Sequence, residues 1–489
     1  MTSMMPPTPL LRVDDLAIHG DGVTIAPVSL SLAPGERLTL LGETGSGKSL
    51  IAQAIMGTLP KGLAARGRLA IDGEAFEAAD GRSRRPLWGR TLALLPQEPW
   101  HALDPTMRAV HQVAESHRHV AGRGKHEARQ AASADLAELG LAEAGHKLPG
   151  ELSGGMAQRV AFAAASAGGA TIVIADEPTK GLDAPRRDAV VALLARTPER
   201  GGALLTITHD IDVARRLGGE VAILRQGQVV ERGPAERLLS APQSDYGQRL
   251  LAAEPARWPA PPPLASSREG SVVAATGLAK TRGGRELFRG LSLAIQPGEI
   301  VGVVGPSGCG KSTLGDMLLG VAPADAGEIH HAPGSPLGRQ KLYQDPPAAF
   351  SPHWTLGRLL DDLVRRHRLD RTAIAPLMTR LGLDERLLAR RPGEISGGEL
   401  QRFAILRVLL LEPRFLFADE PTSRLDPITQ RETLALLVEL ARERRCGVML
   451  VSHDPALIER LCDRRLSLEQ EVPAAREHLA RPEATPSLS

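Results

Sequence analysis

Unbroken apolar runs that end in polar residues recur along the chain; two of them read TIVIADE (residues 171–177) and ALLTITHD (residues 203–210). Continuous apolar runs of this length are typical of strands that are buried on both faces of a parallel sheet. Helical segments alternate with them, and the stretch from Met107 to Leu148, rich in Ala, Glu and Leu, predicts a mostly helical insert. The pattern therefore indicates an α/β fold.

Ordered landmarks recur in both halves of the chain at nearly one offset, which indicates an internal duplication. The offset is 263 residues at the first landmark, 247 at the second, and 243 or 244 at the others. The landmark pairs are Gly42 and Gly305, Gln97 and Gln344, Gly154 and Gly397, Asp176 and Asp419, and His209 and His453. The fall of 16 residues after the first pair predicts a local deletion in the second copy.

A segment rich in proline and small residues, AEPARWPAPPPLASSREG from Ala253, separates the two copies. Its composition predicts an extended linker that joins neither core, with a boundary near Ser267. The predicted division is a first domain at 1–252, a linker at 253–268, a second domain at 269–470 and a polar, partly disordered tail at 471–489.

Charge and cysteine usage narrow the cellular setting. Lys and Arg number 59 and Asp and Glu 57, a formal net charge of +2, so no overall positive field would recruit nucleic acid as a partner. Cys309, Cys446 and Cys462 lack the spacing of a zinc site or a disulfide framework, which favours a reducing, cytoplasmic compartment. No signal peptide or membrane span is predicted, so a membrane role is expected only through a partner.

Two loops fit the phosphate-binding pattern G-x-x-x-x-G-K-[ST]. Their glycines let main-chain N–H groups converge on phosphate oxygens, and the following helix N-terminus favours negative charge. Lys48 and Lys311 are expected to contact the β- and γ-phosphates, while Ser49 and Ser312 offer a hydroxyl to Mg²⁺. The loop residues assigned to nucleotide binding are Gly42, Glu43, Thr44, Gly45, Ser46, Gly47, Lys48 and Ser49, and Gly305, Pro306, Ser307, Gly308, Cys309, Gly310, Lys311, Ser312 and Thr313.

Cys309 lies inside the second loop and leaves two alternatives open. Loop amides and Lys311 could lower the pKa of its thiol and make it reactive, or the residue could be a small side chain that fills tight space.

Each copy ends one apolar run with two carboxylates, Asp176 and Glu177 in the first and Asp419 and Glu420 in the second. The first of each pair is expected to face the metal, and the second to polarise the attacking water. A histidine follows a later run in each copy, and it could contact a γ-phosphate because phosphoryl transfer depends mainly on positioning and electrostatics. The predicted catalytic residues are Glu177, His209, Glu420 and His453.

A serine and two glycines precede a predicted helix in LSGGM (from Leu152) and in ISGGE (from Ile395). Their N–H groups could bind a phosphate, or the serine could only cap the helix. The residues concerned are Ser153, Gly154, Gly155, Ser396, Gly397 and Gly398.

Taken in this order, the motifs resemble those of the nucleotide-binding domains of ABC transporters, almost throughout the chain and twice over. The resemblance implies two tandem P-loop domains, each with a RecA-like core, a β-rich part and a helical subdomain, which bind ATP and Mg²⁺ and hydrolyse ATP. It identifies SGG as the signature, GLD (181–183) and RLD (424–426) as D-loops, and Gln97 and Gln344 as Q-loop glutamines. The residues expected on the metal, directly or through water, are Ser49, Gln97, Asp176, Ser312, Gln344 and Asp419.

A narrower resemblance is to the nickel, dipeptide and oligopeptide importers, carried by QEPWHALDP and QDPPAAFSP after the Q-loop glutamines. Residues 227–255 resemble the C-terminal extension of that subfamily, with Tyr246 in its usual aromatic position. The resemblance implies two fused ATPases at the cytoplasmic face of the bacterial inner membrane. Expected partners are two membrane permease subunits and, indirectly, an extracytoplasmic solute-binding protein. The solute, whether peptide, nickel or metal chelate, stays open.

The sequence departs from the family pattern at the base-binding and signature positions. An aromatic residue usually stacks on adenine, whereas His19 and Arg282 lie nearest to that position here and could stack through their planar groups. Met156 and Glu399 replace the commonest signature glutamine.

In ABC proteins the signature of one domain completes the site of the other. Head-to-tail pairing of the two copies would bring Lys48 to Ser396 and Lys311 to Ser153. Two alternatives to an importer remain: a soluble twin ATPase acting on ribosomes or DNA, and a fused sugar-import ATPase. The first usually carries zinc modules or a long charged linker, and the second commonly has a degenerate second site; neither feature is found in this sequence.

Overall fold

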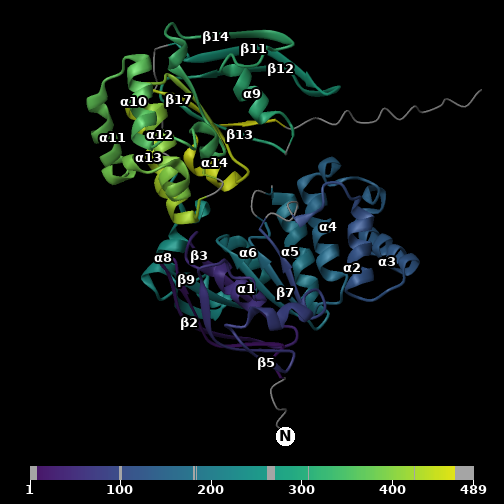
Figure 1. The fold of residues 1–489 in the computed structure, drawn as a ribbon. Coiled ribbons are helices and arrows are strands. Elements are labelled where there is room, and N and C mark those ends of the chain that lie inside the picture. The colour runs from purple at the N-terminus through teal and green to yellow at the C-terminus, as the bar shows by residue number, and fades with distance from the viewer. Residues whose placement is uncertain are drawn as a thin grey trace, which may run out of the picture.

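The computed structural model describes residues 8–97, 102–179, 182, 184–260, 270–306, 308–422 and 425–468. The chain folds into two α/β halves, the first coloured purple to teal and the second green to yellow in Figure 1. Each half combines an antiparallel sheet, a mainly or wholly parallel sheet and a group of helices.

The first half contains two sheets, with strand orders β2-β1-β4-β5 and β10-β9-β3-β8-β7-β6. Its strands are β1 (Leu11–Gly20), β2 (Val23–Leu32), β3 (Arg37–Gly42), β4 (Ala64–Ile71), β5 (Glu74–Glu77), β6 (Leu92–Leu95), β7 (Ile172–Asp176), β8 (Ala203–Thr208), β9 (Glu220–Arg225) and β10 (Gln228–Pro234). Its α-helices are α1 (Lys48–Met56), α2 (Ala109–His119), α3 (Lys125–Glu138), α4 (Gly154–Ser166), α5 (Ala184–Glu199), α6 (Ile211–Leu217), α7 (Ala235–Leu238) and α8 (Asp245–Ala252). Short 3₁₀ turns are η1 (Gly81–Leu87), η3 (Ala142–Ala144), η4 (Pro149–Glu151) and η5 (Pro255–Arg257).

The second half repeats this arrangement with strand orders β12-β11-β14 and β15-β16-β17-β13-β18. Its strands are β11 (Val273–Arg282), β12 (Arg285–Ile295), β13 (Ile300–Val304), β14 (Ala326–His331), β15 (Arg339–Leu342), β16 (Phe415–Asp419), β17 (Gly447–Val451) and β18 (Arg464–Ser467). Its α-helices are α9 (Lys311–Leu318), α10 (Leu356–His367), α11 (Ile374–Arg380), α12 (Gly397–Leu409), α13 (Pro427–Glu443) and α14 (Pro455–Leu461). Its 3₁₀ turns are η6 (Pro336–Gly338), η7 (Pro346–Ala349), η8 (Arg371–Ala373), η9 (Glu385–Ala389) and η10 (Pro392–Glu394).

The sequence-based expectations for these elements are confirmed. Strands β7 and β8 are buried and pair in parallel, as their continuous apolar runs predict. Helices α2 and α3 form most of the predicted helical insert. The predicted deletion falls where the first half has β5 and η1 after β4, because the described second half passes from β14 to η6.

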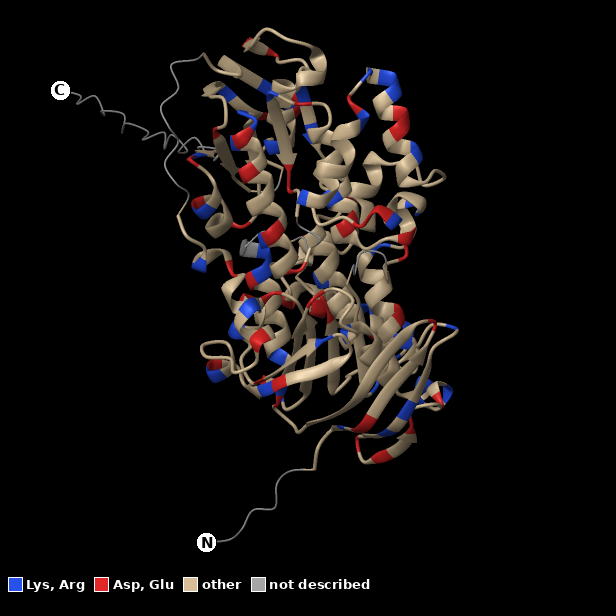
Figure 2. Ribbon diagram, turned by 90° about the vertical axis from the view of Figure 1, so that its left-hand side faces the viewer, with Lys and Arg blue, Asp and Glu red and all other residues tan. Residues whose placement is uncertain are grey.

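Charges of both signs are mixed over the surface. Figure 2 shows Lys and Arg beside Asp and Glu along the helices of both halves, which agrees with a formal net charge of +2. Within the described ranges, every helix is too short or too polar to cross a bilayer.

The start of the linker is packed against the second half. Trp258 is 5% exposed and belongs to the same hydrophobic cluster as Ile458 and Leu461 of α14, and its indole Nε1 donates to the carbonyl of Ala253 at 3.0 Å. The prediction that the whole linker joins neither core is therefore wrong at Trp258. Burial of a large aromatic side chain lowers the free energy by more than the segment would gain in conformational entropy by remaining extended.

Helix α8 makes a second contact between the halves, against α13. Arg431 donates to the carbonyl of Ala252 at 2.9 Å, and Arg249 lies 3.9 Å from Glu432. Ile428 packs against the apolar cluster of the first half that contains Tyr246. The segment from α8 to Trp258 thus joins the halves non-covalently as well as along the chain.

We predict that Trp258→Ala lowers the free energy of unfolding of the second half by about 3 kcal/mol, because a buried aromatic is lost from its core. Differential scanning calorimetry would measure the shift. Trp354→Ala is the matched control, since Trp354 is 37% exposed, and it should cost about 1 kcal/mol or less. Equal effects of the two changes would show that Trp258 is no part of the core.

Candidate functional site

Each phosphate-binding loop joins a central parallel strand to a helix, β3 to α1 and β13 to α9. The last loop glycines, Gly47 and Gly310, cap these helices at φ values of 97° and 105°, a left-handed conformation that an L side chain would strain. Lys48 donates to the carbonyls of Gly42 and Glu43 at 2.8 Å each. Lys311 makes the equivalent contacts with the carbonyls of Gly305 and Pro306 at 2.7 and 3.0 Å.

A serine hydroxyl meets an aspartate carboxylate beside each loop. The Ser49 hydroxyl donates to Asp176 Oδ1 at 3.0 Å, and Ser312 donates to Asp419. These paired oxygens are the ligand type that Mg²⁺ prefers, so the residues fit the expected metal. Burial raises the pKa of Asp419 in the second site and lowers the pKa of Lys48 in the first. Charges in both sites are therefore poorly hydrated and interact strongly.

The two predicted water-polarising glutamates each contact the predicted histidine of the same half. His209 Nδ1 lies 2.8 Å from Glu177 Oε1, and His453 Nε2 lies 2.6 Å from Glu420 Oε1. Both glutamates have a φ of 46°, which is uncommon for a residue other than glycine. Strained backbone of this kind concentrates at functional sites.

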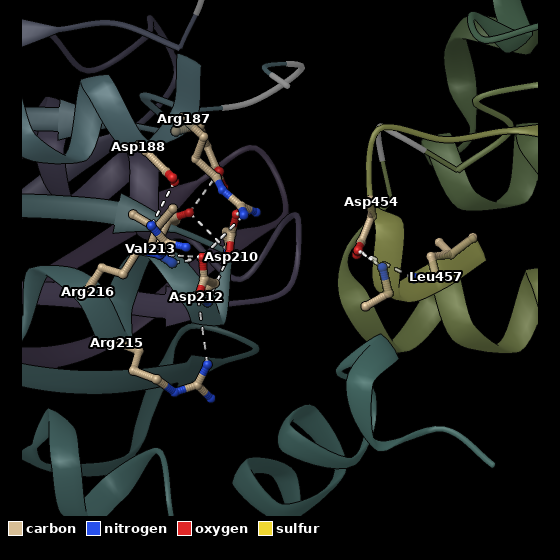
Figure 3. Close-up of polar contacts among 12 residues, drawn as sticks. Arg187, Asp188, Asp210, Asp212, Val213, Arg215, Arg216, Asp454 and Leu457 are labelled. Atoms are coloured by element: carbon tan, nitrogen blue, oxygen red, sulfur yellow. Dashed lines mark hydrogen bonds and ion pairs between the residues drawn. The ribbon is translucent and has the colours of Figure 1, made fainter. Parts of the chain in front are cut away.

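An aspartate after each histidine caps the next helix and so fixes the turn that carries the histidine (Figure 3). Asp210 accepts from Asp212 N at 2.9 Å, and Asp454 accepts from Ala456 N at 2.9 Å. Arg187 lies 3.5 Å from Asp210 and 3.3 Å from Asp212, at the position where the repeat places Gln430. Its positive charge also reaches Asp454 of the second turn, where it opposes the rise in the pKa of that carboxyl that burial causes.

Both glutamate–histidine pairs line one cavity between the halves. Its lining includes Glu177 and His209 from the first half and Glu420 and His453 from the second. The strand ends that carry the chemistry of the two copies therefore face each other.

A residue of the second half also lies beside the first phosphate loop. Asp426, the last residue of RLD, is buried and caps α13 through a bond from Thr429 N at 3.1 Å. Burial and then the Asp426 carboxylate raise the pKa of Glu43 in the first loop. The D-loop of the second copy is thus an electrostatic neighbour of the first copy's site.

The two signature serines cap their own helices. Ser153 accepts from Met156 N at 3.4 Å at the start of α4, and Ser396 accepts from Glu399 N at 3.3 Å at the start of α12. Glu399, a departure from the family pattern, also accepts from the Ser396 hydroxyl at 2.8 Å. Both serines therefore cap their helices, and phosphate binding by the signature residues stays a prediction.

The remaining predicted residues are placed unevenly. Gln344 donates to Glu420 Oε2 at 2.8 Å, while Gln97 lies two residues beyond β6. Arg282 lines a cavity with Lys311, which keeps it a candidate for base stacking, and His19 lies exposed on β1. Several predicted positions lie outside the described residues. They are Ser307, residues 98–101 of the first Q-loop extension, residues 180, 181 and 183 around the first D-loop, residues 423 and 424 at the second D-loop, and the tail at 471–489.

Sequence reasoning missed one contact of the first loop. The hydroxyl of Tyr246 accepts a hydrogen bond from Glu43 N at 2.9 Å, although 203 residues separate the two positions. The sequence predicts Tyr246 only as the aromatic position of a C-terminal extension. The chain has 2 tyrosines, and this scarcity was the available signal in the sequence.

Cys309 packs inward. Its side chain is 2% exposed and belongs to an apolar cluster with Val303 and Leu314. This geometry favours the second alternative, a small residue in tight space, over a reactive thiol.

Comparison with known proteins gives one matching family model, described as ABC transporter, at residues 25–180 and 288–423. The chain is 33% identical to the peptidoglycan transport ATP-binding protein YejF of Agrobacterium fabrum (strain C58 / ATCC 33970), over 93% of the chain and 90% of that protein. It is 33% identical to the glutathione import ATP-binding protein GsiA of Salmonella typhi, over 92% of the chain and 83% of that protein. A structure titled "Model of ribosome-bound archaeal Pelota and ABCE1" matches with a TM-score of 0.65 at 20% identity, covering 92% and 76% of the two chains.

We predict that none of the three thiols reacts readily in the folded protein, because Cys309, Cys446 and Cys462 are all free and buried. Burial also raises the pKa of Cys446 and of Cys462 to about 12, which leaves little thiolate. Titration with a thiol reagent should show slow labelling before unfolding and three equivalents after it. Rapid labelling of Cys309 that Mg-ATP prevents would instead support the reactive alternative; Cys309→Ser identifies the site.

Proposed function

The chain belongs to the ABC transporter family, and on this premise we propose that it is the ATP-hydrolysing subunit that drives import of a peptide-like solute through two partner permeases. The observation that carries the proposal is that both copies repeat the same contacts. In each copy a loop lysine, a serine–aspartate pair and a glutamate–histidine pair lie at the ends of parallel strands.

The contacts suggest a division of labour within each site. Loop amides and the lysine bind the phosphates of ATP, and the serine and aspartate hold Mg²⁺, which reduces the charge of the triphosphate when bound. Glu177 and Glu420 polarise the attacking water. His209 and His453 orient the carboxylates of these glutamates and sense the γ-phosphate. Gln344, which donates to Glu420, extends this contact toward a permease-facing segment, and Gln97 takes the corresponding role in the first copy by its place in the repeat.

Peptide-like solutes are the best-supported class. The two relatives described above are named for peptidoglycan and glutathione, both of which contain amino-acid units, and neither is named for nickel. An extracytoplasmic binding protein and the permeases would select the solute. The ATPase would then lie at the cytoplasmic face of the bacterial inner membrane, held there by the permeases, and it needs no nucleic acid.

The competing functions have weaker support. The ribosome-bound structural match is 20% identical and supports the fold alone. A fused sugar importer commonly has a degenerate second site, whereas Asp419, Glu420 and His453 retain their contacts here.

We further propose that the two copies pair head to tail, so that Lys48 works with Ser396 and Lys311 with Ser153. The support is the electrostatic proximity of Asp426 to Glu43 and Lys48 across the halves, together with the cavity that both glutamate–histidine pairs line. Two similar domains related by a pseudo-twofold axis form two equivalent interfaces.

The test of pairing is nucleotide trapping. Glu177→Gln or Glu420→Gln should slow ATP hydrolysis by about 100-fold or more while phosphate binding remains, so ATP becomes occluded at that residue's own site. Adding Ser153→Arg should abolish the occlusion produced by Glu420→Gln, since both changes then affect the Lys311 site. Retention of radiolabelled ATP after rapid gel filtration is the measurement.

The matched control combines Ser153→Arg with Glu177→Gln, which head-to-tail pairing predicts to keep its occluded ATP. If Ser153→Arg removes occlusion only from the Glu177→Gln chain, each copy completes its own site and the pairing is wrong.

Recruitment to the membrane tests the importer function itself. Expressed alone, the chain should remain in the supernatant after ultracentrifugation, and co-expression with its two partner permeases should move it to the membrane fraction. Co-sedimentation with ribosomes, without recruitment by the permeases, would favour the twin-ATPase alternative.

A further inference from the structure

The two phosphate loops differ at their second residue, which is Glu43 in the first copy and Pro306 in the second. Glu43 has a main-chain N–H, which donates to the hydroxyl of Tyr246 at 2.9 Å in a partly buried position. Proline has no N–H to satisfy. The described part of the second copy ends at Leu468, soon after β18, so the equivalent of α8 and of Tyr246 is not among its described elements.

The loops are otherwise held alike. The carbonyls of Glu43 and Pro306 both accept from the loop lysine, at 2.8 and 3.0 Å. Gly42 is the last residue of strand β3, and its extended backbone is the conformation that a proline at position 43 would require of the residue before it. At the second loop position, the first copy therefore has a glutamate whose N–H is bound by a tyrosine, and the second copy has a proline with no N–H to bind.

Tyr246 is fixed by its surroundings. Its side chain is 3% exposed and packs in a cluster with Leu41, Leu250 and Leu251, and the guanidinium of Arg225 lies 5.3 Å from its ring centroid. Burial raises the pKa of the phenol, so the hydroxyl stays protonated. A rigid, neutral acceptor is thus held against the loop amide.

The helix that carries Tyr246 also contacts the opposite half. Arg431 of α13 donates to the carbonyl of Ala252 at the end of α8, and Ile428 packs against the cluster that includes Tyr246. Figure 1 shows α8 at the junction of the two halves. One short helix therefore touches both the first phosphate loop and the second half.

We propose that Tyr246 is a positioning residue for the first phosphate loop. Through this residue, helix α8 couples the first nucleotide site to the position of the opposite half. The second loop, which has Pro306 at this position, cannot make the same contact. The proposal rests on the nucleotide-binding role of that loop. Loss of the hydroxyl leaves a partly buried N–H without this acceptor, and the loop must then shift to satisfy it before ATP can bind.

A double-mutant cycle tests the coupling between the hydroxyl and the amide. In the full chain with Lys311→Ala, which silences the second site, calorimetric titration with Mg-ATP reports the first site. Tyr246→Phe should weaken binding about tenfold when residue 43 is glutamate, and less than about twofold when Glu43→Pro has already removed the N–H. The cycle compares the effect of Tyr246→Phe on affinity in the two backgrounds, so the effect of Glu43→Pro by itself cancels.

Tyr343→Phe is the matched control, because Tyr343 is the other tyrosine of the chain, is 41% exposed and lies in the second half. It should leave first-site affinity within about twofold. Equal losses from Tyr246→Phe in both backgrounds would overturn the proposal, since the ring would then act by packing and not through the amide.

Hydrogen–deuterium exchange without nucleotide separates this proposal from the function on which it rests. In Tyr246→Phe the peptide containing Glu43 should exchange faster, while the peptide containing Pro306 is unchanged. Unchanged exchange at Glu43 overturns the positioning role even if ATP binds. Faster exchange in a chain that binds no ATP would support the hydrogen bond and refute the nucleotide site.

Discussion

The register of the central parallel strands is the constraint on which each site depends. Asp176 pairs with Ile207 across β7 and β8, and Asp419 pairs with Val451 across β16 and β17. The ladder continues one residue further, because Glu177 N donates to the carbonyl of Ile207 at 2.8 Å and Glu420 N to that of Val451 at 3.0 Å. A one-residue slip would turn every motif side chain to the opposite face of its sheet. Strand pairing therefore supplies the precision that the chemistry needs.

Much of this could be predicted from the sequence, because the determining signals are local. Buried parallel strands leave continuous apolar runs, and their carboxyl ends meet at one edge, so residues after such runs are site candidates. The repeated offsets made the second site as predictable as the first. The family resemblance also predicted which motif of each copy takes which role.

Other contacts could not be predicted, because no local pattern encodes them. The partner of Glu43 lies on a helix 203 residues away, and composition assigned Trp258 to a tether although its indole is buried. The two histidines meet their glutamates through different ring nitrogens, Nδ1 in the first half and Nε2 in the second. Such contacts are set by backbone and side-chain orientation after folding.

The burial of Trp258 changes which part of the chain is the tether. Since Trp258 packs on the second half, the chain crosses from one half to the other between the end of α8 and Trp258. Trp258 thus belongs to the linker by composition and to the second half by packing. A chain break just after Trp258 would yield two polypeptides, the first of which would carry its own docking peptide for the second. Fusion and non-covalent assembly are therefore separable properties of this protein, with fusion adding effective concentration to an interface that already exists.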